Sequence, residues 1–281
     1  MSARGQGSVV QPRGAARRLL AANAWLVYAF FYAPILALIV LSFNDNRLVG
    51  VWRGFTLDWY GQMLANGAVM RAIRNSLIVA AISTVLATAL GTAAALALER
   101  YRFRGRQTFD ALLYLPVIVP DVTMAVMLLL FFVRAADAAF VVSGTQVRLG
   151  LTTITLSHVA FNISFVAIVV RARLAGMDPT LEEAAADLYA GRWQAFRRIT
   201  LPQMTPGVLG GALLALTLSL DDVVITSFVS GPGSTTLPVY VFGLVRRGVT
   251  PLINAVSTVM LVASMLLVLA SVLLQRRRGP A

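Results

Sequence analysis

Apolar runs long enough to cross a lipid bilayer recur along this chain and constrain its fold more than any other feature. A membrane-spanning α-helix needs about 20 mostly apolar residues. Overall, 58% of the residues are hydrophobic and 13% are charged, about half the charged share of an ordinary soluble domain. The sequence predicts an all-α integral membrane protein with a disordered tail (1–20) and a membrane domain (21–281). Its six predicted transmembrane helices are 22–43, 75–98, 107–133, 150–170, 208–228 and 251–274.

Arginine is distributed unequally between the connections that separate these runs. All 24 basic residues are arginines, and 16 of them lie before the first run, in 99–106, in 171–201 or after the last run. Basic loops are retained on the cytoplasmic side of a membrane. We therefore expect a multi-pass protein whose termini and 171–201 connection are cytoplasmic. We interpret 22–43 as an uncleaved span, because it is longer than the apolar region of a signal peptide.

Composition also excludes several classes of protein. The arginines form short clusters beside apolar runs, so the net charge of +12 reflects membrane topology and not nucleic-acid binding. The chain has no cysteine, which excludes disulfides and thiolate metal sites. It has no lysine either, and a phosphate-binding P-loop requires one. We therefore expect no enzyme activity and no cofactor on this chain, with any ATP hydrolysed by a partner.

Three aspartates interrupt the apolar runs and are the candidate substrate-path residues: Asp121, Asp221 and Asp222. Ionisable residues within a membrane are costly and indicate function by default, and carboxylates in a basic protein favour a cationic cargo. Asp222 shares one helical stripe with Ser219 and Thr226, whereas Asp221 points about 100° away. The structural alternative is that the aspartate pair caps a helix break.

Two other features of the spans bear on a substrate path. Pro116 and Pro120 fall within the run 107–133, where prolines release backbone carbonyls that only protein or a water-filled cavity can satisfy. We interpret this run as one kinked helix that lines the path. His158, the only histidine, could be a ligand or a proton relay, but we favour a packing role because a lone histidine usually has one. A short re-entrant or interfacial helix is predicted over 237–249.

The least membrane-like stretch of the chain, 180–206, interrupts the series of spans. Thr180 and Glu183 have the spacing of a capping box that begins a helix. Gly191 separates that piece from a second one, which Pro202 is expected to end. Small side chains at 184–186 allow another backbone to come close. The sequence thus predicts two short polar helices that dock on a partner; an amphipathic helix lying on the membrane is the alternative.

This stretch resembles the EAA loop of ATP-binding-cassette (ABC) importer permeases, and we place the loop at 178–202. The resemblance implies that the loop docks into a cleft on a separate ATPase. In this family pattern Tyr189 stands where glycine is usual, which allows the turn between the short helices to be shifted toward the next glycine. The residues that we assign to ATPase coupling are Glu183, Ala184, Ala185, Gly191, Ile199, Leu201 and Pro202.

Other stretches are similar to the polyamine branch of these permeases, and above all to permeases of putrescine importers: FYAPILALIVLSFN, RFRG, PVIVPDV and residues 218–257. The resemblance implies a type I ABC importer permease fold and a polyamine importer in a bacterial inner membrane. Its implied partners are a second, similar permease in a heterodimer, two copies of an ATPase that bind ATP and Mg²⁺, and an extracytoplasmic polyamine-binding protein.

Several alternatives stay open at this point. The chain could be an importer permease for thiamine, sulfate or ferric iron, although the aspartates and residues 218–257 count against these cargoes. It could also be a secondary transporter or channel that needs no ATPase, or a scaffold that transports nothing. The sequence does not choose between putrescine, spermidine and other diamines.

Overall fold

The computed structural model describes residues 14–46, 51–144, 146, 148–178, 180–246, 248 and 250–276. Within these residues the protein is helical, apart from turns and one isolated antiparallel bridge between Asn44 and Phe55. Five of the described helices are long and apolar enough to cross a membrane, and the described part of α12 (Pro251–Arg276) contributes a shorter apolar stretch. The predicted all-α membrane class is confirmed, while the bounds of several predicted spans differ.

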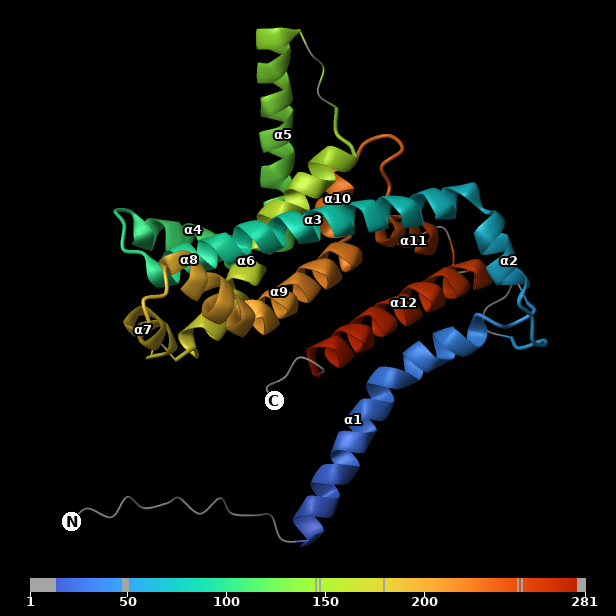
Figure 1. The fold of residues 1–281 in the computed structure, drawn as a ribbon. Helices are drawn as coiled ribbons and strands as arrows, with labels where there is room; N and C mark the ends of the chain where they lie inside the picture. Colours follow the sequence, from blue (N-terminus) through green and yellow to red (C-terminus); the bar gives the residue numbers. More distant parts are fainter. Residues whose placement is uncertain are drawn as a thin grey trace.

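Three helices form the centre of the bundle: α3 (Gly67–Arg100), α6 (Leu151–Ala175) and α9 (Leu201–Asp221). Figure 1 shows α3 running along the molecule, with α6 and α9 beside it. Small residues let membrane helices approach closely, and the α3–α6 contact depends on one of them. A Cβ added at Gly91 would lie 2.8 Å from both the Ile163 carbonyl oxygen and the Val166 Cβ. The contact between α3 and α6 therefore leaves no room for a side chain at position 91.

The predicted third span consists of two helices, α4 (Arg106–Ile118) and α5 (Asp121–Ser143). Pro116 is accommodated inside α4, but Val119 and Pro120 are extended, with ψ of 131° and 139°. Pro120 lacks the N–H that a continuous helix needs, and it disfavours the helical conformation at the residue before it. The chain therefore leaves the helix here, and α5 points away from the bundle in Figure 1. The prediction of one kinked helix is wrong.

Residues around Pro202 form one continuous helical segment. It contains α8 (Arg192–Ala195), the π-helix η1 (Phe196–Thr200) and α9. At the junction the Leu201 N–H donates to the Phe196 carbonyl, five residues earlier. A wider π-turn removes the conflict between a proline ring and the carbonyl four residues before it. Pro202 thus lies inside the first turn of α9, and the prediction that it ends a helix is wrong.

The predicted fifth span is also interrupted. α9 ends at Asp221, and α10 (Val224–Val229) follows after a break at 222–223. α10 packs against α5 and α6. The turn after α10 is held against the start of α6, because Thr153 Oγ1 donates to the Val229 carbonyl at 2.7 Å. Gly231 lies directly against the Leu149 carbonyl, with no room for a Cβ.

The remaining long helix, α1 (Gly14–Leu41), is exposed along its apolar length and contacts the rest of the chain mainly at α12. Residues 14–20, which we expected in a disordered tail, are the first turns of α1; residues 1–13 lie outside the described part of the chain. The short helix expected over 237–249 is present as α11 (Leu237–Val245), and residues 247 and 249 are among those not described.

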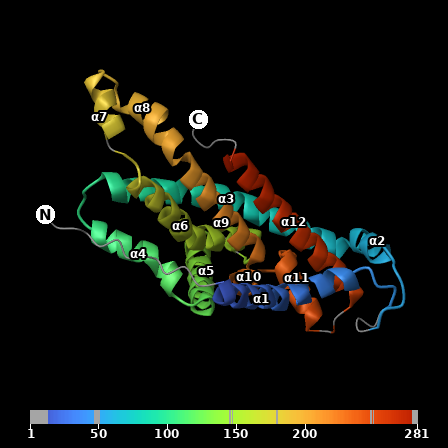
Figure 2. The same cartoon turned by 90° about the horizontal axis from the view of Figure 1, so that it is seen from below.

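The two ends of the bundle differ. Figures 1 and 2 place α8 and α7 (Thr180–Asp187) beyond one end of α3, and α2 (Asp58–Ala65) beyond its other end. The 178–202 loop therefore lies at the Arg100 end of α3 and the α1–α2 connection at the Gly67 end. Any substrate path through the bundle must run between these two ends.

Candidate functional site

The aspartate at the break between α9 and α10 lies in a hydrogen-bond network inside the bundle. Asp222 Oδ2 accepts from the Thr226 N–H at 2.7 Å, from Thr226 Oγ1 at 2.6 Å and from His158 Nε2 at 3.2 Å. Its Oδ1 accepts from the Ile225 N–H at 3.2 Å. Asp222 therefore caps the first turn of α10, as the structural alternative supposed. It is also joined to α6 through His158.

His158 is buried, and both of its ring nitrogens have partners. Besides Asp222, Nε2 lies 3.0 Å from Thr226 Oγ1, while Nδ1 lies 2.7 Å from Ser219 Oγ. Ser219 Oγ is in turn 3.0 Å from Ser83 Oγ of α3. A carboxylate only accepts hydrogen bonds, so a neutral ring carries its proton on Nε2 and accepts from Ser219 at Nδ1. The network thus joins α3, α6, α9 and α10.

The position of this network along the bundle follows from Ser83. This residue lies at the middle of α3, about 25 Å from either end at 1.5 Å per residue. Since the hydrocarbon core of a bilayer is about 30 Å thick, a bilayer centred on α3 encloses the network. A carboxylate at this depth needs partners, and the Asp222 contacts supply them.

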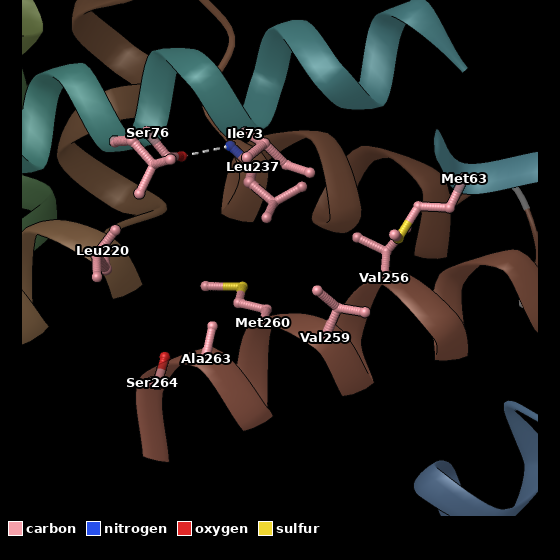
Figure 3. Close-up of a pocket in the computed structure, with 11 residues that line it drawn as sticks. Met63, Ile73, Ser76, Leu220, Leu237, Val256, Val259, Met260, Ala263 and Ser264 are labelled. Atoms are coloured by element: carbon pink, nitrogen blue, oxygen red, sulfur yellow. Dashed lines mark hydrogen bonds between the residues drawn. The ribbon is translucent and has the colours of Figure 1, made fainter. Parts of the chain in front are cut away.

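Asp221 is exposed and faces a different part of the bundle. It lines a cavity of about 190 Å³ between α9 and α12. Leu220, Met260 and Ser264 line this cavity and also a neighbouring one of about 160 Å³, which is almost wholly apolar. Figure 3 shows the apolar cavity between α3, α11 and α12, with Met260 pointing into it. A carboxylate therefore lies beside a continuous run of apolar lining.

Asp121 is the first residue of α5, where a negative charge complements the partial positive charge of a helix N-terminus. Its side chain is exposed, and no described residue forms a hydrogen bond or ion pair with it. The structure thus brings Asp222 together with Ser219 and Thr226, as the stripe predicts, and leaves Asp121 and Asp221 facing away from that network.

The 178–202 loop begins with a different cap from the one that the sequence predicts. The Thr180 N–H donates to Asp178 Oδ1 at 2.9 Å, and this hydrogen bond holds the pKa of Asp178 below its ordinary value. Thr180 is itself the first helical residue of α7. The predicted capping box between Thr180 and Glu183 is therefore wrong, and Asp178 satisfies the free N–H of the first turn.

α7 ends at the position where the family pattern has glycine. The Tyr189 N–H donates to the Ala186 carbonyl and the Ala190 N–H to the Ala185 carbonyl, each at 2.9 Å, which are the two bonds of a Schellman motif. Tyr189 has φ 60°, in the left-handed region, whereas Gly191 has φ −65°. The turn therefore stays at residue 189 and is not shifted. Tyrosine holds a conformation that glycine adopts more easily.

Glu182 fastens α7 to the bundle. Both terminal nitrogens of Arg100, the last residue of α3, donate to its carboxylate, and Thr200 Oγ1 of η1 donates as well. The hydrogen-bonded Arg100 guanidinium holds the pKa of Glu182 below its ordinary value, with a smaller contribution from Thr200 and an opposing one from burial. A second cluster fastens α3, α4 and α6 at the same end: Arg171 contacts Glu99 at 2.8 Å and Asp110 at 2.5 Å.

The residues assigned to ATPase coupling do not all face outward. Ala185 is buried against its own chain, with 8% of its surface exposed. Ile199 is half-buried in η1, while the others are exposed: Glu183, Ala184, Gly191, Leu201 and Pro202. Sequence reasoning missed the most exposed large apolar side chains of the loop, which are Leu188, Tyr189 and Trp193. Sequence reasoning also missed the hydrogen bond between His158 and Asp222 and the ion pair between Arg100 and Glu182, because each joins residues far apart in the sequence.

The fold belongs to a known class, the permease subunits of ABC importers. A chain from a bacterial ABC transporter involved in the import of the acidic polysaccharide alginate superposes with a TM-score of 0.77, covering 95% of this chain and 96% of that chain at 21% identity. A chain of the MetNI methionine ABC transporter superposes with a TM-score of 0.60, covering 80% of this chain and all of that chain at 16% identity. At these identities the likeness shows the fold, which is that of the type I importer permeases.

Sequence comparison then gives the family. Residues 87–280 match the family described as binding-protein-dependent transport system inner membrane component, and the chain belongs to it. It is 47% identical to the putrescine transport system permease protein PotI of Escherichia coli (strain K12), over 84% of this chain and 83% of that protein. It is 41% identical to the spermidine/putrescine transport system permease protein PotC of Haemophilus influenzae, over 93% and 99%. A putative 2-aminoethylphosphonate permease protein, PhnV of Salmonella typhi, is 31% identical over 92% and 94%.

Proposed function

We propose that this permease forms the membrane path of an ATP-driven importer of polyamines such as putrescine or spermidine. The observation that carries the proposal is its identity of 47% and 41% to permeases of putrescine and spermidine/putrescine systems, over most of both chains. The relative named for a phosphonate is less similar, at 31%. Carboxylates within the bundle add physical support, because a protonated amine entering the membrane needs opposite charges there.

The cavities beside Asp221 suit the chemistry of such a cargo. A polyamine is a short aliphatic chain that carries ammonium groups. Asp221 offers a carboxylate at one side, and the apolar lining shared through Leu220 and Met260 offers a surface for methylene groups. Asp222 supplies a second carboxylate one residue further along, at the depth of Ser83. We assign the path to Asp121, Asp221 and Asp222, with Asp121 contributed from the start of α5.

The partners follow from the two ends and the exposed helices. The exposed apolar residues of the 178–202 loop fit a contact with an ATPase, two copies of which would bind ATP and Mg²⁺. The uncovered apolar surfaces of α1 and α5 fit a second, similar permease, so that the membrane part would be a heterodimer. An extracytoplasmic polyamine-binding protein would deliver cargo at the α2 end. The arginine distribution supports cytoplasmic termini and a cytoplasmic 178–202 loop.

An uptake assay tests the cargo. The complete transporter would be expressed in bacteria that lack their own polyamine uptake, and the entry of radiolabelled putrescine and spermidine would be measured against unlabelled thiamine, sulfate and ferric iron. We expect both polyamines to enter, and we expect unlabelled polyamine, but not thiamine, sulfate or ferric iron, to inhibit their entry. Replacing the P-loop lysine of the partner ATPase should abolish it. Uptake that survives this replacement would instead indicate a secondary transporter, and uptake of no polyamine would contradict the proposed cargo.

The orientation has a separate test. Because the chain has no cysteine, single substitutions give a clean signal with a membrane-impermeant thiol reagent. In intact cells we expect Gly233→Cys to be labelled and Arg192→Cys to be protected. Labelling of Arg192→Cys from outside would reverse the orientation.

A further inference from the structure

The two oxygens of the Asp222 carboxylate are used unequally. Oδ2 has three donors, from His158 Nε2, the Thr226 hydroxyl and the Thr226 N–H. Oδ1 has one, the Ile225 N–H at 3.2 Å. A carboxylate oxygen has two lone pairs, so Oδ2 is saturated while Oδ1 retains capacity for a further donor. The Asp222 side chain also keeps 16% of its surface exposed, compared with 3% for His158.

The hydrogen bonds of His158 and Thr226 converge on Oδ2. With a neutral ring, the Ser219 hydroxyl donates to His158 Nδ1, which leaves the ring proton on Nε2, facing Asp222 Oδ2 at 3.2 Å and Thr226 Oγ1 at 3.0 Å. Ser219 is itself held by Ser83. Ser219 therefore fixes both the tautomer and the orientation of the imidazole, because the hydrogen bond made by one ring nitrogen determines the state of the other. The ring in turn fixes the rotation of the Asp222 carboxylate.

From this geometry we propose that His158 is a positioning residue for the transport of cationic cargo. It holds Oδ2 of Asp222 so that Oδ1 remains free to accept a hydrogen bond from an ammonium group. Without His158 the carboxylate loses one of the donors that fix its rotation and can turn further onto the Ile225 and Thr226 N–H groups that it already caps, which draws Oδ1 away from the path. This inference rests on the proposed function, since it requires that an ammonium group reaches Asp222.

Two amide substitutions separate this role from packing. The side-chain amide of glutamine reaches the position of Nε2 and can donate to Asp222, whereas that of asparagine reaches only the position of Nδ1. The initial rate of putrescine uptake per assembled transporter would be measured for His158→Gln and His158→Asn. Ser157→Ala is the control, because Ser157 is buried on the same helix and donates only to the Thr153 carbonyl.

We expect His158→Asn to lower the rate about tenfold or more, the range for loss of a hydrogen bond to a charged group. His158→Gln and Ser157→Ala should stay within about threefold of the unmodified protein. In the Asp222→Asn background, His158→Asn should produce no further loss, because the two residues act as one unit. Wild-type uptake by His158→Asn, equal losses in Asn and Gln, or additive losses in the double mutant would each overturn the proposal.

Two further outcomes have a defined meaning. If the His158→Asn transporter does not assemble, Ser219→Ala is tested instead. This substitution frees the imidazole ring to turn and should lower uptake several-fold. Unchanged uptake would overturn the positioning role. If the unmodified transporter imports no putrescine, the proposed function fails. Failure of His158 alone, in a transporter that imports putrescine, leaves the proposed function intact.

Discussion

Glu182 on α7 and Arg100 at the end of α3 form a two-point ion pair that joins the 178–202 loop to the longest helix of the bundle. Thr200 adds a hydrogen bond to the same carboxylate. We expect movement of the loop by a partner ATPase to reach α3 through Glu182, which contacts Arg100, and not through the exposed Glu183.

Charge reversal tests this connection. Because the pair is partly exposed, it should contribute about 1 kcal/mol or less to stability, so Glu182→Arg should leave the permease folded. We expect it to lower the amount of cargo transported per ATP hydrolysed, and the double variant Glu182→Arg with Arg100→Glu to restore part of that ratio. Transport and hydrolysis would be measured together in reconstituted vesicles. A double variant that is worse than both single ones would contradict the connection. Asp187→Arg, a charge reversal at an exposed acidic residue of the same helix, is the matched control.

Acid should loosen the same connection. The pKa of Glu182 is lowered in the folded protein, so its stabilising effect is fully present above the ordinary glutamate pKa of about 4.3 and is lost as pH falls through the folded value. Hydrogen exchange of α7, measured from pH 7 downward and corrected for the intrinsic rate, should accelerate only below the ordinary pKa. In Glu182→Gln it should be fast throughout. Protection that fades between pH 7 and pH 5 would point to another group.

Most substitutions destabilise a protein, but the left-handed turn at Tyr189 predicts one that stabilises it. A left-handed conformation costs a non-glycine residue about 1–2 kcal/mol, so Tyr189→Gly should stabilise the fold of the loop. Tyr189→Ala removes the same ring and keeps the backbone cost, which makes it the matched control. Comparing the two by hydrogen exchange of α7 isolates the backbone effect. Equal exchange in both variants would mean that the strain is absent.

Some features of this fold follow from local sequence, and others depend on how distant residues pack. Length and apolarity identify the spans, because a helix in lipid satisfies its own backbone. Pro120 and Pro202 have the same local signal, yet one breaks a helix and the other lies in the first turn of α9, directly after the π-helix. That outcome depends on what packs around each proline. His158 and Asp222 lie in different predicted spans, and sequence spacing alone does not tell which faces of two helices meet.

Ala184 and Ala185 differ in a way that their family motif does not reveal. Ala185 is buried in its own chain, so Ala185→Trp should overpack the loop and destabilise it by about 1–3 kcal/mol. Ala184 is exposed, so Ala184→Trp should leave the permease as stable as before and weaken its hold on the ATPase. Thermal unfolding of the permease and co-purification of the ATPase separate the two effects. If both variants lose the ATPase on co-purification while the permease unfolds at its normal temperature, Ala185 belongs to the contact surface after all.

Neutralising the aspartates tests the substrate path itself. Asp222→Asn keeps the shape of the side chain, so α10 should stay capped through the remaining amide oxygen while the charge inside the membrane is lost. Asp221→Asn and Asp121→Asn remove the charges at the cavity and at the start of α5. If a protonated amine needs these carboxylates, uptake of radiolabelled putrescine should fall about tenfold or more for Asp222→Asn. Assembly of the transporter and ATP hydrolysis without cargo should persist in all three variants.

The control for these variants is Asp110→Asn, which removes a carboxylate that is paired with Arg171 outside the proposed path. It should leave the rate of uptake within about threefold, because Arg171 keeps its contact with Glu99. Asp221→Asn and Asp121→Asn should affect uptake less than Asp222→Asn, since both side chains are exposed to partners and solvent that can supply other charges. Normal uptake by all three single variants and by the triple variant would show that the cargo does not use these carboxylates.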